Sequence, residues 1–236
     1  KFWEEIFFPY LKENDIKTIF HLGDIVDRRK YINFVTAKRL EDEFIKPCAD
    51  NGIELYVIAG NHDTFYRNTN EVNALRQLYG SSGYSNMKLY WDEPVEVELD
   101  GCNIMLAPWL CNDNWEKSIE AFKNTKAQVL MGHFQIMGFE MDKGHICTDG
   151  MDKTIFDKFD AVYSGHFHQP SCIGNITYLG AQYEMTWADY DQKRGFSVFD
   201  TQTREMEYIQ NPLHIFHKIW YDDTEMTIED VANLDT

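Results

Sequence analysis

The sequence predicts a single domain of mixed α/β fold, on three observations. In the first half of the chain, helical patterns alternate with short apolar strands, and in the second half hairpin patterns follow. No repeat, low-complexity tract or Pro/Gly/Ser linker divides the chain. Because each apolar sheet face must be buried against another layer, this order of elements predicts mixed sheets packed together and covered by helices.

The first half combines two helical patterns with two apolar strands. Pro9 should kink the first helix, and the stop signal Asn51-Gly52 should end the second. Both strands are short and apolar enough to be buried. In chain order, the four elements are Phe2–Asn14, Lys17–Leu22, Asn33–Asp50 and Ile53–Ala59.

The second half is richer in strands. Val95–Leu99 and Cys102–Leu106 are joined by Asp100-Gly101, a strong signal for a two-residue hairpin turn. A second hairpin is expected near the end of the chain. The remaining predicted strands are Ala127–Met131, Asp160–Ser164, Gly195–Asp200 and Arg204–Ile209.

Composition places the chain among ordinary globular proteins. It has 236 residues, of which 44% are hydrophobic and 26% charged. No apolar run is long enough to cross a bilayer, and no signal peptide is visible, although the first residue is Lys1. The five cysteines are scattered and form no C-x-x-C pair. We therefore expect reduced thiols in a cytoplasmic protein with no membrane partner.

The net charge is strongly negative, at −17. Proteins that grip nucleic acid by its phosphates usually show a basic patch, so this charge argues against a simple DNA-binding module. It does not exclude an enzyme whose bound metal ions supply positive charge where a phosphate sits.

Polar clusters follow four of the predicted strands, each directly after the strand's carboxyl end. Ligands of α/β sheets bind at these ends, and the glycine that opens each cluster lets the backbone turn sharply. The clusters are Gly23-Asp24-Ile25-Val26-Asp27, Gly60-Asn61-His62-Asp63, Gly132-His133 and Gly165-His166-Phe167-His168. Taken singly, such residues are commonly turn or core residues, whereas four together predict a site.

The residue types in these clusters suit a metal centre. Carboxylate, amide oxygen and imidazole ligands favour divalent ions such as Mn²⁺, Fe²⁺ or Zn²⁺, and no thiol is among them. A carboxylate that bridges two ions allows a pair that clamps a phosphate and activates water for in-line attack. The pattern therefore predicts a two-metal hydrolase.

In this order, the four motifs resemble those of the calcineurin-like metallophosphoesterase superfamily, over about residues 1 to 210. The stretches Gly132–Phe139 and Tyr178–Asp200 are similar to those of the SbcD-type DNA repair nucleases, and most similar to the recombination endonuclease subunits of tailed phages. The resemblance implies two facing mixed sheets flanked by helices. It also implies a nuclease domain over residues 1–212 and a truncated capping region over 213–236.

The resemblance also implies a role for each site residue. Asp24 would bridge two divalent ions, with Mn²⁺ favoured and Fe²⁺, Mg²⁺ or Zn²⁺ as alternatives. One ion would be completed by Asn61, His133 and His166, and the other would be bound by His168. His62 would be the catalytic proton donor to the leaving oxygen, a role that suits imidazole at neutral pH.

Two departures from the family pattern affect these roles. The family's first motif, Asp-x-His on a first strand, does not occur before Gly23, so the chain resembles a fragment whose second ion keeps only Asp24 and His168. Asp27 stands where cellular nucleases of this branch carry His. We expect its side chain to hydrogen-bond His62 and raise the pKa of that imidazole.

The implied substrate is DNA, hydrolysed exo- or endonucleolytically during recombination or repair with an SbcC-type ATPase. Arg28 would contact the scissile phosphate, and Asn70–Tyr79 is a candidate helix for a homodimer interface. Two alternatives stay open. One is a phosphatase or small phosphodiesterase on the same metal core, and the other is a non-catalytic scaffold that lacks the first motif.

Overall fold

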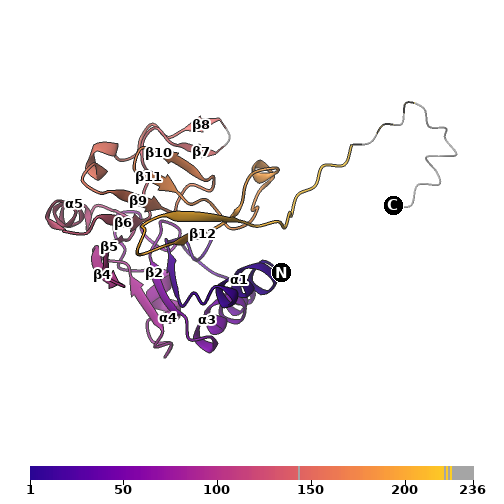
Figure 1. Cartoon of the computed structure of the whole chain (residues 1–236), viewed down its shortest axis with the longest axis horizontal. Coiled ribbons are helices and arrows are strands. Elements are labelled where there is room, and N and C mark those ends of the chain that lie inside the picture. Colours follow the sequence, from indigo (N-terminus) through magenta and orange to yellow (C-terminus); the bar gives the residue numbers. More distant parts are fainter. Residues whose placement is uncertain (143, 221, 223, 225–236) are drawn as a thin grey trace.

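A computed structural model describes residues 1–142, 144–220, 222 and 224 of the chain. Two sheets face each other across a shared core (Figure 1). The smaller sheet has the order β1-β2-β3 and is parallel throughout. Its strands are β1 (Thr18–His21), β2 (Glu54–Ile58) and β3 (Met87–Tyr90).

The larger sheet has six strands in the order β10-β11-β9-β6-β5-β4. Its inner strands are parallel, and β4 and β10 pair antiparallel at its two edges. The strands are β4 (Val95–Leu99), β5 (Cys102–Ala107), β6 (Val129–Gly132), β9 (Ala161–Ser164), β10 (Ser171–Ile173) and β11 (Ile176–Tyr178). Only this sheet is mixed, which refines the prediction of two mixed sheets.

Two antiparallel hairpins complete the strands. The predicted terminal hairpin is β12 (Gly195–Phe199) with β13 (Met206–Gln210), and a short one joins β7 (Glu140–Asp142) to β8 (His145–Ile146). The predicted turn between β4 and β5 is confirmed: Asp100 and Gly101 have φ angles of 50° and 81°. Both angles are positive, as a type I′ turn requires.

Helices cover the outer face of the smaller sheet. Leu11, Phe44, Cys48 and Leu75 pack there against Leu55 and Val57 of β2. The helical elements are η1 (Phe2–Phe7), α1 (Phe8–Glu13), α2 (Phe34–Leu40), η2 (Glu41–Ile45), α3 (Lys46–Asp50) and α4 (Ala74–Tyr79). The two long helices predicted from the sequence are therefore present in segments.

Proline explains where these two helices change character. η1 and η2 are π-helical, and each leads into an α-helix with proline in its first turn, Pro9 in α1 and Pro47 in α3. A proline has no N–H, so the carbonyl one turn earlier loses its ordinary donor and a wider turn forms there. The kink expected at Pro9 is thus a π-to-α transition.

The outer face of the larger sheet is covered by α5 (Trp115–Asn124) and η3 (Lys153–Phe156). Phe122 of α5 and Phe156 of η3 pack against Leu130 and Val162 of the sheet. The inner faces of both sheets meet in a third cluster, where Ile58 contributes from β2 and Val129 from β6. This sandwich brings the carboxyl ends of β1, β2, β6 and β9 into one region.

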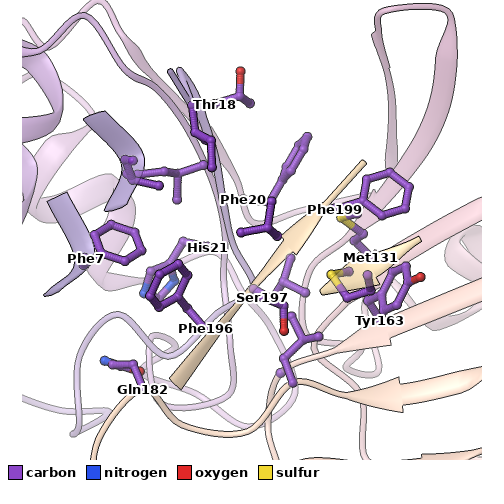
Figure 2. Close-up of a pocket in the computed structure, with 18 of the residues that line it drawn as sticks. Phe7, Thr18, Phe20, His21, Met131, Tyr163, Gln182, Phe196, Ser197 and Phe199 are labelled. Carbon is purple, nitrogen blue, oxygen red and sulfur yellow. The ribbon is translucent and has the colours of Figure 1, made fainter. Parts of the chain in front are cut away.

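A groove of about 420 Å³ separates β1 from β12. Figure 2 labels Phe20 and His21 of β1, and Phe196, Ser197 and Phe199 of β12, among the side chains that line it. In their sheets, β1 pairs only with β2 and β12 only with β13, so both strands have an unpaired edge among the described residues. Met131 and Tyr163 of the larger sheet also line the groove.

Among the described residues, the last strand ends at Gln210. The segment that follows still contacts the body of the protein, because Asn211 is buried and Glu184 accepts hydrogen bonds from the N–H groups of Ile215 and Phe216. Of the predicted capping region 213–236, residues 221, 223 and 225–236 lie outside the described residues. The predicted boundary at 212 and the interface helix stay predictions. α4 begins at Ala74, and its Leu75 and Tyr79 are buried in the chain's own core. None of the described helices combines the length and apolarity of a membrane span.

Candidate metal centre

Four donor side chains converge at the carboxyl ends of the strands. Asp24 follows β1, Asn61 follows β2, His133 follows β6 and His166 follows β9. Ligand atoms of Asp24, His133 and His166 all lie within 4.8 Å of one another. The amide oxygen Oδ1 of Asn61 lies 2.9 Å from both His133 Nε2 and His166 Nδ1. The structure thus brings together the four residues predicted to hold one ion.

The orientation of the His133 ring favours a bound cation. Its Nδ1 lies 2.7 Å from the carbonyl oxygen of Leu22, which accepts a hydrogen bond and so fixes the proton on Nδ1. Nε2 then faces two oxygens, Oδ2 of Asp24 at 3.2 Å and Oδ1 of Asn61 at 2.9 Å. Either a proton on Nε2 or a cation between these atoms offsets the repulsion among them. This donor set fits a divalent metal ion.

Electrostatics in the cluster agree with this arrangement. Burial alone would raise the pKa of Asp24, but the ring of His133 and the N–H of His62 outweigh it and lower the pKa to about 2. Burial and then the neighbouring His133 lower the pKa of His166 to about 3, which leaves its imidazole neutral at pH 7. Burial opposes a charge on His133, yet Asp24 raises its pKa, so Nε2 lies where a positive charge, either a proton or a bound metal ion, is favoured. The site pairs a carboxylate with imidazoles that can ligate.

Two glycines are required for the close approach of the loops. A Cβ on Gly23 would lie 2.4 Å from His133 Nδ1, and one on Gly60 would lie 2.2 Å from Asp24 Oδ1. Gly23 also has a φ of 88°, which side chains rarely adopt. Any larger residue at either position would push a ligand out of place.

Two of the candidate ligands have unusual backbone conformations. Asp24 has a φ of 56° and His166 a φ of 85°, both on the left-handed side. Such conformations cost roughly 1–3 kcal/mol each outside glycine and gather at functional sites. The backbone is therefore strained at two of the three residues whose ligand atoms lie within 4.8 Å of one another.

Asp63 is a positioning residue whose role the sequence did not reveal. It is 1% exposed, and its Oδ2 accepts hydrogen bonds from the N–H groups of Asp24 and Gly60, both at 2.7 Å. Its Oδ1 accepts a third from Val26 at 3.2 Å. Burial, followed by the charge of Asp24, raises the pKa of Asp63 to about 7. This carboxylate ties the loop after β1 to the loop after β2.

His62 lies exposed beside the cluster. Its main-chain N–H donates to Asp24 Oδ1 at 2.7 Å, which links the candidate acid to the candidate bridging ligand. Its ring Nδ1 lies 2.5 Å from the main-chain oxygen of Asp27. A carbonyl only accepts hydrogen bonds, so Nδ1 carries the proton and Nε2 is the atom available for proton transfer.

The predicted contact between the Asp27 side chain and His62 is corrected by the structure. The Asp27 carboxylate is 85% exposed and lies 3.3 Å from Nε of Arg28. The physical reason is that the loop after β1 turns the carbonyl of Asp27, and not its side chain, toward the imidazole. Asp27 therefore contacts His62 through its backbone.

Arg28 lies on the exposed rim of the site. Its guanidinium donates to the hydroxyl of Tyr31 and lies 5.5 Å from the centre of the Tyr31 ring. With Asp27 on its other side, Arg28 is held at the surface rather than among the ligands. Its predicted contact with a phosphate stays a prediction.

His168 lies apart from the cluster. It is exposed, and within the described part of the chain it does not join the group formed by Asp24, His133 and His166. Burial of part of its ring lowers the pKa of His168, so it too is neutral at pH 7. Its assignment to a second ion stays a prediction.

Trp109 is a further residue that the sequence did not single out. Its ring centre lies 5.3 Å from that of His166 and 6.0 Å from that of His133. The indole thus forms an apolar wall beside both imidazoles. Tryptophan is common in cores, and nothing around Trp109 in the sequence separates this role from ordinary packing.

Comparison with known proteins identifies the family of the chain. The sequence model of the calcineurin-like phosphoesterase family matches residues 1–170. The chain is 37% identical to exonuclease subunit 1 of Enterobacteria phage T4, over 90% of this chain and 61% of that one. It is 22% identical to the D subunit of the SbcCD nuclease from Staphylococcus saprophyticus, over 83% of this chain and 57% of that one.

The chain thus spans about three fifths of the length of these curated relatives. A solved crystal structure aligns over 88% of this chain and 95% of its own at 12% identity, with a TM-score of 0.53, which shows a shared fold. The family match covers all four predicted motifs, since the last of them ends at His168. On this match, the chain belongs to the calcineurin-like phosphoesterase family.

Proposed function

We propose that this chain is the catalytic part of a metal-dependent DNA nuclease that hydrolyses phosphodiester bonds. The observation that carries the proposal is the convergence of Asp24, Asn61, His133 and His166 on one point in a family of phosphoesterases. DNA is proposed as the substrate because both curated relatives are named as nucleases.

The ligand residues divide into two sets. Asp24, Asn61, His133 and His166 would hold one divalent ion, and Asp24 with His168 would hold part of a second. Mn²⁺ is the proposed ion, with Fe²⁺, Mg²⁺ and Zn²⁺ as alternatives for the same nitrogen and oxygen donors. When bound, such ions supply Lewis-acid activation of the phosphate and of the attacking water.

His62 serves as the proton donor in this proposal. Its Nδ1–H is fixed on the Asp27 carbonyl at 2.5 Å, so the protonated ring presents Nε2–H outward. The imidazole is exposed, as a group that must meet a substrate oxygen has to be. Transfer of the Nε2 proton to the leaving oxygen produces a neutral alcohol in place of an alkoxide.

Arg28 is proposed to contact the phosphate backbone of the substrate. The net charge of −17 repels DNA at long range, so local positive charge must offset it. The exposed guanidinium of Arg28 on the rim supports such a contact, with Asp27 and Tyr31 limiting its motion.

The second ion needs further ligands, and we propose that a strand with the family's Asp-x-His motif supplies them by pairing with the free edge of β1. The groove between β1 and β12 supports this placement, because both strands offer an unpaired edge to it (Figure 2). Gly23, next to Asp24, lines the groove, so a strand parallel to β1 would end beside the bridging ligand. The helix that precedes β1 would then join two parallel strands.

The partners follow from the same relatives. We propose an SbcC-type ATPase as the partner subunit, because one relative is a subunit of an SbcCD nuclease. A homodimer and action in the bacterial cytoplasm, in a phage-infected host or a bacterium, are proposed alongside it.

Hydrolysis assays with Mn²⁺ on linear DNA and on a small phosphodiester test the substrate class. The nuclease proposal expects cleavage of DNA that stops when the metal is chelated. Hydrolysis of the small ester alone would support the phosphodiesterase alternative. A full-length protein that binds Mn²⁺ but hydrolyses neither substrate would support the scaffold.

A further inference from the structure

A buried ion pair contacts the loop that carries His168. Arg194 and Asp189 have side chains 2% and 7% exposed, with Nη2 of Arg194 2.5 Å from Oδ1 of Asp189. Nη1 of Arg194 donates to the carbonyl oxygen of His168 at 2.8 Å. The arginine therefore connects an aspartate to the main chain of a candidate metal ligand.

The pair also joins three segments of the chain. Oδ2 of Asp189 accepts hydrogen bonds from the N–H groups of Met185 and Thr186, at 2.7 and 2.8 Å. This fixes Asp189 at the end of η4 (Trp187–Asp189). Arg194 comes directly before β12, and His168 follows β9. Loop, 3₁₀ helix and hairpin are thus held by two side chains.

The main chain of His168 is held from two sides. Its carbonyl oxygen accepts a second hydrogen bond from the N–H of Ala181 at 3.0 Å. With both bonds in place, the peptide after His168 cannot rotate without breaking one of them. The two bonds therefore hold the backbone from which the exposed imidazole extends.

The attraction between the two charges alone does not account for such a pair. A buried ion pair is often no more stabilising than a well-packed apolar pair of similar volume, because desolvation offsets the attraction. An apolar pair, however, cannot donate to the carbonyl of His168. Residues behind a ligand that fix its orientation are a recurrent part of metal sites.

We propose that Asp189 and Arg194 are a positioning pair that aims the imidazole of His168 at a metal ion. This inference rests on the proposed function, in which His168 ligates the second ion. The pair acts through His168 and touches neither ion nor substrate. Its loss should weaken one ion and spare the ion held by Asp24, Asn61, His133 and His166.

The test is calorimetric titration of the full-length protein with Mn²⁺ alone. The double variant Asp189→Leu with Arg194→Met removes both charges and keeps apolar volume. His168→Ala shows which binding event depends on that imidazole. A matched control is Asp160→Leu with Arg204→Met, another Asp–Arg pair at 3.5 Å whose side chains are 59% and 42% exposed.

If Asp189 and Arg194 position His168, the double variant should weaken the same Mn²⁺-binding event that His168→Ala weakens. The expected loss of affinity is roughly 10–100-fold, as for other residues that hold metal ligands in place. The other event and the control variant should be unchanged. Arg194→Lys, which keeps the charge but has no fork to span His168 and Asp189, should give an intermediate loss. If the double variant does not fold, the Mn²⁺ titration of Arg194→Lys tests the proposal in its place.

Unchanged Mn²⁺ titration in folded Arg194 variants, with a clear effect of His168→Ala, would overturn the inference. Equal weakening of both events would also overturn it, because that is the mark of a general structural role. If His168→Ala changes nothing, the inference fails together with the assignment of His168. The proposed function fails separately, when the wild-type protein binds no Mn²⁺ or leaves DNA intact.

Discussion

The carboxylate of Asp63 lies 2.7 Å from the main-chain nitrogen of Asp24, so one aspartate holds the backbone of the other. Asp24 needs this support because its φ of 56° is unfavourable for a residue with a side chain. The same carboxylate holds Gly60 and thereby the loop that carries Asn61 and His62. The geometry of the metal centre thus depends on a residue that is not among its ligands.

Asp63→Asn should destabilise the protein and disturb the site. All three partners of Asp63 are N–H donors. An amide nitrogen in place of either oxygen would therefore face at least one N–H group that has lost its acceptor. An unsatisfied buried polar group costs about 1–3 kcal/mol in the free energy of unfolding. Urea denaturation measures this loss, and Mn²⁺ titration should show weaker binding. Asp113→Asn, at an exposed position, is the control and should match the wild type.

His62→Ala should retain metal and lose turnover. The ring of His62 contacts the Asp27 carbonyl and is exposed, so its removal leaves the four converging donors in place. Loss of a general acid typically lowers kcat by about 10²–10⁴-fold. Elemental analysis measures whether the metal is retained, and kcat on DNA measures the loss of turnover. An emptied site in the variant would mean that His62 is a ligand.

Asp27→Asn should have little effect on turnover. The carbonyl that orients His62 belongs to the backbone and is kept in the variant, while the exposed side chain of Asp27 pairs with Arg28. We expect a change in kcat far below the roughly 10²-fold that loss of a general acid costs. A large loss of kcat with metal content preserved would show that the carboxylate acts on His62 during turnover.

Acid should destabilise the folded chain partly through His21. Burial lowers the pKa of His21 to about 4, and its Nδ1 has no hydrogen-bond partner among the described residues. The unfolded imidazole takes up a proton below its ordinary pKa of about 6.5, whereas the folded one does so only near pH 4. The contribution of His21 is therefore present above pH 6.5 and lost as the pH falls to about 4.

The measurement is the free energy of unfolding between pH 7 and pH 4 for the wild type and His21→Phe. The wild type should lose up to about 1.4 kcal/mol more per pH unit than the variant. His166, which has a similarly lowered pKa, is common to both proteins and cancels in the comparison. Equal slopes would show that His21 does not titrate in this range.

Much of the site was predictable from the sequence because it depends on strand ends. Apolar runs followed by Gly and polar residues placed Asp24, Asn61, His133 and His166 at the carboxyl ends of strands, and parallel pairing then brought them together. The type of each ligand is local information. So is the hairpin at Asp100-Gly101, since two positive φ angles select those residues.

The rest depends on contacts between distant residues. The choice between the side chain and the carbonyl of Asp27 as partner of His62 is set by the path of a loop, which residue types do not encode. Arg194 meets the carbonyl of His168 only after β12 has docked beside the loop that follows β9. β3 has four half-buried residues, and this pattern is too short to identify a strand from the sequence. It forms a strand because it pairs with β2.

Cleavage of linear DNA by the full-length wild-type protein and by its His133→Ala variant, each with Mn²⁺ and with Mn²⁺ plus chelator, tests the central claim most directly. His133 Nε2 lies within 3.2 Å of an oxygen of Asp24 and within 2.9 Å of one of Asn61, so its removal should eliminate the first ion site. We predict Mn²⁺-dependent cleavage by the wild type, none with chelator and none by the variant. Equal cleavage by the variant and the wild type would contradict the account.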